Sequence, residues 1–239
     1  MDAEDFEKIE QEYERTKHSF QKEDKLFVAE QIAKSLGKNA SLASEVYKFL
    51  IRAFENKLRA DKKTPLVFHS IFLTRILYSL GEESADQFLV GALHDVPEDT
   101  NVSEEELREQ PFLKNKGYII DYLKTLTENK NLSREPDGKS LPPRYREHIK
   151  RIIGSPKEVI STEIIDRFCD LSDLEYITEL PEEERTLRLT SKLIKTKSFV
   201  ENIIRGRADI SQNCLDLFNY KLKKVEDYWK LSPKAEFIS

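Results

Sequence analysis

The sequence predicts an all-α protein, and three observations support this fold class. The chain holds only seven glycines and nine prolines among 239 residues, so turn-forming residues are scarce. Long stretches place apolar residues at the three- to four-residue spacing of an amphipathic helix, among charged residues that make up 35% of the chain. Polar clusters with Gly or Pro separate these stretches and divide the chain into successive helices.

The first half of the chain is expected to supply the core helices. Gly37 and Gly81 suit helix C-caps, and DKKTP (61–65) is a turn. The segment before His94 is apolar nearly all round, so this helix is expected to be central. The predicted helices here are 4–35, with a break near His18 to Asp24, then 41–59, 67–80 and 84–94.

Pro97 determines where the central helix ends. Proline lacks an N–H group and clashes with the preceding helical turn, so the helix is expected to end near His94 and Asp95. Glu98 and Asp99 are then expected on the turn that follows. One histidine and three carboxylates therefore gather at the end of a buried helix.

The second half of the chain contains a capping signal, a long loop and further helices. Ser103, followed by Glu106, forms a capping box that starts a helix. Residues 129–143 (NKNLSREPDGKSLPP) are polar with three prolines, which is typical of a functional or mobile loop. The predicted helices that follow are 143–153, 157–178, 182–205 and 208–229.

The composition argues against several classes of partner. The net charge is −5 and the pI is near 5.6, so we expect no nucleic acid as the main partner. No run approaches the ~18–20 apolar residues that span a membrane, and the acidic N-terminus has no secretory signal. Cys169 and Cys214 fit reduced, buried thiols better than a disulfide framework. These features predict a cytoplasmic protein with no membrane partner.

Two histidines and two aspartates are candidate metal ligands. His69 begins an apolar helix, and His94 closes the central helix beside Asp95. Asp166 lies in the apolar segment STEIIDRFCDL, where an unpaired buried carboxylate would be costly, so it either faces solvent or has a partner. Two imidazoles and two carboxylates suit a divalent transition metal, whereas a closed zinc site normally uses cysteine. The two histidines interpreted as surface residues are His18 and His148.

Each candidate alone has an ordinary structural interpretation. A single histidine on an apolar helix, such as His69, is more often packed and hydrogen-bonded than bound to a metal. Asp166 belongs to a stripe of carboxylates at helical spacing, which could equally be a solvated face. The stripe consists of Glu163, Asp166, Asp170 and Asp173.

Taken together, the motifs resemble those of the HD-domain metal phosphohydrolases. HDVPEDT (94–100) resembles the HDxxEDT signature of the hydrolase domain in RelA/SpoT-type alarmone enzymes and in single-domain small alarmone hydrolases. TPLVFH (64–69) is similar to their TPYxxHP stretch, and IIDRFCDL (164–171) is similar to their LADRLxNL stretch. LTENKNL (126–132) resembles a segment between these motifs. The resemblance covers roughly residues 45–180.

The resemblance implies a fold, a metal ion and a reaction. The fold is an HD-domain helical bundle with additional N- and C-terminal helices. Glu98 and Asp99 would orient or deprotonate the attacking water. The implied reaction removes the 3′-pyrophosphate of ppGpp or pppGpp. The residues that would bind one divalent ion, typically Mn²⁺ with Fe²⁺ or Co²⁺ as alternatives, are His69, His94, Asp95 and Asp166.

The chain departs from the family pattern on the side that would hold the nucleotide. The proline after the first motif histidine is Ser70 here. The lysine before the last metal motif is Glu163, the asparagine after it is Asp170, and Asp173 occupies a usually neutral position. Extra carboxylates facing an anionic nucleotide would repel it unless a cation intervenes.

Basic residues near the motifs are candidates for binding phosphate. Arg59, Lys62 and Lys63 precede the first motif histidine, in a region where family members keep phosphate-contacting residues. Lys130 and Arg134 belong to the long loop, and arginine suits bidentate phosphate contact. Each could also be an ordinary surface charge. The residues assigned here to substrate binding are Arg59, Lys62, Lys63, Lys130 and Asp170.

The chain is predicted to form one domain over most of its length. Its parts are an N-terminal helical extension at 1–40, an HD core at 41–180 and C-terminal helices at 181–239 that pack on the core. The first part could pack likewise or mediate oligomerisation, so the oligomeric state stays open. Two other functions also stay open. One is an HD hydrolase of another nucleotide, such as an adenine alarmone or a dinucleotide phosphate, and the other is a non-catalytic nucleotide-binding regulatory module.

Overall fold

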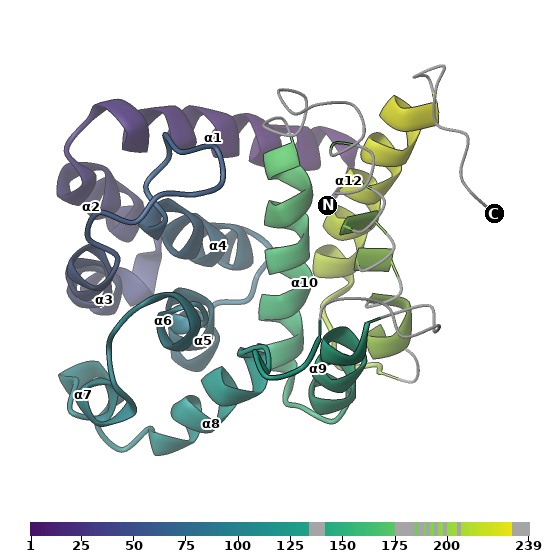
Figure 1. Cartoon of the computed structure of the whole chain (residues 1–239). Coiled ribbons are helices and arrows are strands. Elements are labelled where there is room, and N and C mark those ends of the chain that lie inside the picture. Colours follow the sequence, from purple (N-terminus) through teal and green to yellow (C-terminus); the bar gives the residue numbers. More distant parts are fainter. Residues whose placement is uncertain are drawn as a thin grey trace.

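The computed structural model describes residues 1–133, 142–174 and 207–230, together with single positions between 185 and 204. Every named element in this part of the chain is helical, and an isolated bridge between Leu58 and Pro65 is the β-type pairing described there. The predicted all-α fold class is confirmed (Figure 1). The helices are α1 Ala3–Lys22, α2 Lys25–Ser35, η1 Gly37–Asn39, α3 Ala40–Ala53, α4 Val67–Ser79, α5 Ala85–Leu93, α6 Val96–Asp99, α7 Glu104–Arg108, η2 Pro111–Leu113, α8 Gly117–Leu126, α9 Pro143–Ile153, α10 Lys157–Ser172 and α12 Gln212–Lys230.

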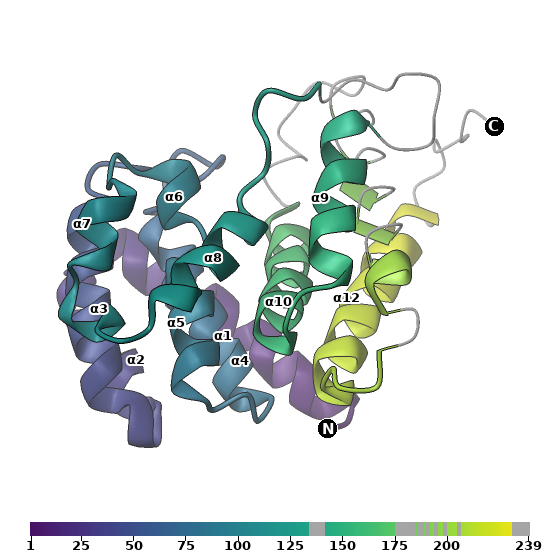
Figure 2. The same ribbon diagram turned by 90° about the horizontal axis from the view of Figure 1, so that it is seen from below.

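Helix α10 stands in the middle of the molecule. Helices α4 and α5 pack against it from one side and α12 packs along it from another, while α8 and α9 also contact it. Figure 1 shows α10 between the helices of the first half of the chain and α12, and the view from below in Figure 2 shows the same order. Because neighbours surround this helix, most of its side chains are buried, including polar ones. Each polar group on α10 therefore needs a partner.

Two predicted helices end earlier than expected. Helix α10 ends at Ser172 rather than at residue 178. Helix α3 ends at Ala53 rather than near residue 59. Asn56 adopts a left-handed backbone with φ of +61°, which no helix can continue through. The Leu66 N–H then donates to the Lys57 carbonyl at 2.8 Å, so the chain turns back on itself before α4 begins.

Several local signals in the sequence are confirmed. The break in the first predicted helix lies between α1 and α2, where the Asp24 side chain accepts from the Phe27 N–H. The capping box at Ser103 is present at the start of α7. Helix α5 ends directly before His94. Residues 134–141 of the predicted long loop, and much of the predicted 182–205 helix, lie outside the described residues.

The interpretation of His148 as a surface residue is wrong. Its side chain is 1% exposed and faces α10, where its Nε2 atom lies 3.3 Å from Glu163 Oε2. The other inward residues of α9 include Tyr145, Ile149 and Ile152. His148 lies three and four residues from Tyr145 and Ile152, so helical spacing places it on the buried face. His18 is exposed, as expected.

The N-terminal helices and α12 pack onto the same core as the central helices. Helix α1 contacts α4 and α12, and α2 packs along α3. The division of the chain at residues 40 and 180 stays a prediction. Cys169 and Cys214 are free thiols and are buried. Among the helices that the structure describes, none combines the length and the apolar character needed to cross a membrane.

Helices α4 and α5 approach each other closely at Gly91. A β-carbon at this position would lie 2.9 Å from Leu77 Cδ1 and 3.0 Å from Leu73 Cδ2. Both leucine side chains are fully buried, so they have little room to move away. The missing side chain therefore allows the two helices that carry His69 and His94 to lie side by side.

We expect Gly91→Ala to lower the free energy of unfolding by about 1–2 kcal/mol, because overpacking outweighs the ~1 kcal/mol gained in helix propensity. Chemical denaturation measures this change. Gly154→Ala is the matched control, because Gly154 ends α9 at φ of −91° with open space around its Cα. Its effect should stay within ~0.5 kcal/mol. Equal effects at the two positions would contradict the close approach at Gly91.

Candidate metal centre

Three helices bring the candidate metal ligands together. His69 lies in the first turn of α4, and His94 follows the last residue of α5. Asp95 lies between α5 and α6, and Asp166 projects from the middle of α10. Since α4, α5 and α10 pack against one another, residues almost one hundred positions apart in the sequence meet at one point.

Pro97 shapes the junction that carries two of these residues. It occupies the first turn of α6 and has no N–H to continue the hydrogen-bond ladder of α5. The chain starts a new one-turn helix instead, in which the Asp99 N–H donates to the Asp95 carbonyl at 2.8 Å. Glu98 and Asp99 thus lie on a short helix rather than on the expected open turn.

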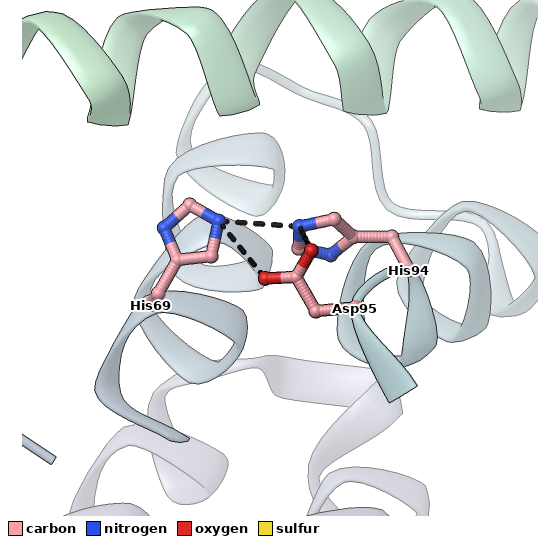
Figure 3. A group of neighbouring side chains, drawn as sticks. All are labelled: His69, His94 and Asp95. Atoms are coloured by element: carbon pink, nitrogen blue, oxygen red, sulfur yellow. Dashed lines mark hydrogen bonds and ion pairs between the residues drawn. The ribbon is translucent and has the colours of Figure 1, made fainter. Parts of the chain in front are cut away.

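The distances between the nitrogen and oxygen atoms of this group are short. The Nε2 atoms of His69 and His94 are 3.1 Å apart, and His94 Nε2 lies 3.2 Å from Asp95 Oδ1 (Figure 3). His69 Nε2 lies 3.6 Å from Asp95 Oδ2 and 2.9 Å from Asp166 Oδ1. Two nitrogen atoms and carboxylate oxygens thus face a common point below α10.

This donor set fits a divalent metal ion. Ligand atoms about 2.1 Å from one ion are about 3.0–3.4 Å apart in octahedral or tetrahedral geometry. The separations of 3.1 and 3.2 Å fall in this range and that of 2.9 Å lies just below it, while His69 to Asp95 at 3.6 Å and His94 to Asp166 at 3.9 Å are longer. The Nδ1 atom of His94 lies 2.8 Å from the Gly91 carbonyl and donates to it in the tautomer that leaves Nε2 with a lone pair. The Nδ1 atom of His69 is buried without a partner among the described residues, so this ring is oriented by packing and by the contacts of its Nε2 atom.

The carboxylates of the group favour a bound cation. Burial alone would lower the pKa of His94, but the carboxylates of Asp95 and Asp166 raise it to about 9, so this ring must release a proton to bind a metal ion. Burial opposes ionisation of Asp166, yet Arg167 and the two histidines hold the pKa of this carboxyl well below its usual range. Both carboxylates are therefore ionised at neutral pH and present negative charge to the point that the imidazoles share.

Glu98 and Asp99 lie beside this group in a different electrostatic environment. Burial and the charge of Asp95 raise the pKa of both carboxyl groups, with Glu128 adding to the effect at Glu98. The Glu128 N–H donates to Glu98 Oε2 at 3.3 Å, and the Lys130 ammonium donates to the Glu98 carbonyl at 2.9 Å. The first residues of the long loop thus pack against α6 and fix the position of Glu98.

A cavity of about 410 Å³ opens above the candidate ligands. Its volume falls within the usual range for a small-molecule site. Besides the metal-site residues, its wall includes Arg59, Lys17, Lys192 and the carboxylates of α10. Lys62, Lys63 and Lys130 do not belong to the described residues that line it, and Arg134 lies outside the described residues. Of the residues assigned to substrate binding, the structure therefore brings Arg59 and Asp170 to the cavity.

The sequence reasoning missed the partners of the α10 carboxylates. Glu163 Oε1 accepts from Arg167 Nε at 2.7 Å, and His148 approaches its other oxygen. Asp170 accepts from Arg167 at 3.2 Å and from Lys192 at 3.3 Å. These pairs show that the stripe is not a solvated face. Arg167 lies three residues from Asp170 and four from Glu163, and this helical spacing predicts such pairing.

Asp173 also has partners that come from distant parts of the chain. The Tyr13 hydroxyl and the Lys17 ammonium donate to Oδ1 at 2.7 and 3.1 Å, and Arg59 Nε donates to Oδ2. Tyr13 and Lys17 lie on one face of α1, at helical spacing. The N-terminal helix, whose role the sequence left open, thus supplies part of the cavity wall.

Comparison with known proteins identifies the fold. No protein-family model and no curated protein matches the sequence. Among solved structures, a metazoan orthologue of SpoT, described as hydrolysing ppGpp and as having a role in starvation responses, matches with a TM-score of 0.56. The identity is 22%, and the match covers 73% of this chain and 92% of the solved chain. The chain therefore has the helical HD-type fold of this SpoT orthologue, with a histidine and aspartate cluster that fits the HD motif.

Proposed function

We propose that the protein is a metal-dependent phosphohydrolase that removes the 3′-pyrophosphate of ppGpp or pppGpp. One observation carries this proposal. Two imidazole Nε2 atoms and the carboxylates of Asp95 and Asp166 converge in a cavity, directly beside the carboxylates of Glu98 and Asp99. The shared fold with a solved chain that is described as a ppGpp hydrolase supports the same reading.

The metal-binding role falls to four side chains from three helical segments. Mn²⁺ is the proposed ion, with Fe²⁺ or Co²⁺ as alternatives, because nitrogen and oxygen donors without cysteine suit these ions. A bound ion would polarise a phosphoryl oxygen and lower the pKa of water. Arg167 lies 3.4 Å from Asp166 Oδ2 and leaves Oδ1 facing the histidines, so it orients this carboxylate. The proposed ligands are His69, His94, Asp95 and Asp166.

Glu98 and Asp99 are the proposed catalytic groups. The pKa values of both carboxyl groups are raised and so lie closer to the working pH, which favours general base catalysis. The water oxygen would bond to the phosphorus next to the ribose while the bond from that phosphorus to the 3′ oxygen breaks. The water proton passes to a carboxylate, the 3′ oxygen gains a proton, and pyrophosphate leaves.

The substrate would bind in the cavity above these groups. We assign Arg59 and Asp170 to its wall, and Lys62, Lys63 and Lys130 to positions from which flexible side chains could reach a substrate. The wall holds more carboxylates than cations, so an anionic nucleotide depends on a divalent cation for attraction. This charge balance is consistent with a metal-dependent reaction.

Metal removal provides the first test. Mn²⁺ should raise the melting temperature of the metal-free protein and restore pyrophosphate release from ppGpp, because a ligand that binds only the folded state stabilises it. Asp95→Ala should lose both effects and bind no Mn²⁺ in equilibrium dialysis. His18→Ala, which removes an exposed histidine that does not line the cavity, should behave like the unchanged protein. Assaying pppGpp and ppApp alongside ppGpp identifies the base, and a full Mn²⁺ response in Asp95→Ala would contradict the assigned site.

Replacement of the catalytic carboxylate separates chemistry from metal binding. Glu98→Gln should retain Mn²⁺ but lower kcat by about 10²–10⁴-fold, because the amide cannot accept the proton from water. Steady-state kinetics with measured pyrophosphate release checks this. Glu105→Gln is the control, since Glu105 is exposed on α7. If kcat is unchanged in Glu98→Gln, the same replacement at Asp99 identifies which carboxylate acts.

A further inference from the structure

Asp173 accepts from three donors that come from two separate segments of the chain. It ends α10 and is 6% exposed. Its Oδ1 atom accepts from the Tyr13 hydroxyl and the Lys17 ammonium of α1, and its Oδ2 atom accepts from Arg59 Nε in the turn before α4. Both oxygens are therefore occupied, and two positive charges share one buried carboxylate.

The other cations of the cavity wall are matched in the same way. Lys192 lies 3.3 Å from Asp170 Oδ1. Arg167 contacts Glu163 and Asp170 through separate nitrogen atoms. Each of the four described lysine and arginine side chains that line the cavity thus faces a carboxylate of α10. Among the described residues of the wall, a phosphate group therefore meets no lysine or arginine that lacks a carboxylate contact.

We propose that Asp173 is a specificity-determining residue that holds Arg59 and Lys17 away from the phosphates of the substrate. This inference rests on the proposed function. The preferred substrate class is then a nucleotide 3′-diphosphate with few further phosphates. An added 5′-phosphate gains little from Arg59 and Lys17, because it must compete with the carboxylate that already binds them, and it is repelled by that carboxylate.

The opposite role for Asp173 makes a different prediction. If Asp173 served to aim Arg59 at the substrate, removing its charge would weaken binding of every nucleotide, and removing Arg59 would do the same. If Asp173 withholds Arg59, removing its charge strengthens the binding of highly phosphorylated ligands only. The burial of the pair favours withholding, since the side chains of Arg59 and Asp173 are only 12% and 8% exposed and a phosphate reaches Arg59 in competition with this carboxylate.

A substrate series with Asp173→Asn distinguishes these roles. Guanosine 3′-diphosphates with one, two or three 5′-phosphates are compared by their KM values with Mn²⁺. In the unchanged protein, KM should rise with each added phosphate. In Asp173→Asn, the KM for the 5′-triphosphate should fall roughly tenfold, and the additional change Arg59→Gln should reverse this gain. An unchanged or raised KM for the 5′-triphosphate in Asp173→Asn would overturn the inference.

Two controls keep the result interpretable. Tyr13→Phe removes a hydrogen bond to the same carboxylate without changing charge, so it should leave the KM series as it is. Thermal melting of each variant verifies folding. Where Asp173→Asn folds poorly, the double variant Asp173→Asn with Arg59→Gln serves as a comparison, because its net charge equals that of the unchanged protein. A change in the series caused by Tyr13→Phe would indicate a structural effect and would count against the inference.

A binding measurement separates failure of the inference from failure of the proposed function. Equilibrium dialysis of inorganic tripolyphosphate against the full-length protein, with and without Mn²⁺, needs no turnover. Asp173→Asn should bind this probe roughly tenfold more tightly than the unchanged protein, and the double variant should not. Absence of nucleotide turnover with this binding pattern would reject the proposed function alone. Equal binding by all variants would reject the role of Asp173, whether or not the protein hydrolyses ppGpp.

Discussion

The structure depends on pairing the buried carboxylates of α10 with cations. An unpaired buried charge is costly, so a central helix that carries Glu163, Asp166, Asp170 and Asp173 can be surrounded only if its neighbours supply positive charge. Arg167 does so from the same helix, and Lys17 with Arg59 from two other segments. His148 of α9 lies 3.3 Å from Glu163 Oε2. Burial would raise the pKa of Asp173, yet Arg59 and Lys17 keep this pKa below its usual value, so the pairs persist at neutral pH. The ion pairs that allow helices to pack around α10 therefore also determine the charge of the cavity wall.

Asp166 differs from the other carboxylates of α10 in the groups that its two oxygens contact. Arg167 contacts one of its oxygens, while the other lies 2.9 Å from His69 Nε2 and faces the point shared with His94. The same helix thus holds structural carboxylates, which are balanced by protein cations, and one carboxylate whose free oxygen suits a metal ion. The close approach of α4 and α5 at Gly91 then sets the distance between the two imidazoles.

The sequence predicted the features that local chemistry determines. Pro97 indicated the end of α5, the capping box indicated the start of α7, and the resemblance of the motifs to those of HD phosphohydrolases indicated which histidines and aspartates meet. It did not predict the partners of Asp173, because Tyr13 and Arg59 lie 160 and 114 positions away and no local pattern links them. His148 was misjudged because its polar neighbours in the sequence outweighed its helical spacing relative to Tyr145 and Ile152. The early end of α3 depends on the left-handed backbone of Asn56, which its sequence neighbours did not indicate.

The same ion pairs limit how the cavity can adapt to other substrates. A cation that is freed to bind phosphate leaves a buried carboxylate unbalanced, and a carboxylate that is removed leaves a buried cation unbalanced. Since Lys17 and Arg59 share Asp173, a change in any one of them alters both the stability of the α1–α10 contact and the charge that the substrate meets. Loss of the Asp173 charge, which frees Arg59 and Lys17 for a more highly phosphorylated nucleotide, would therefore lower the stability of the α1–α10 contact. The specificity proposed for Asp173 is thus tied to the packing of the central helix.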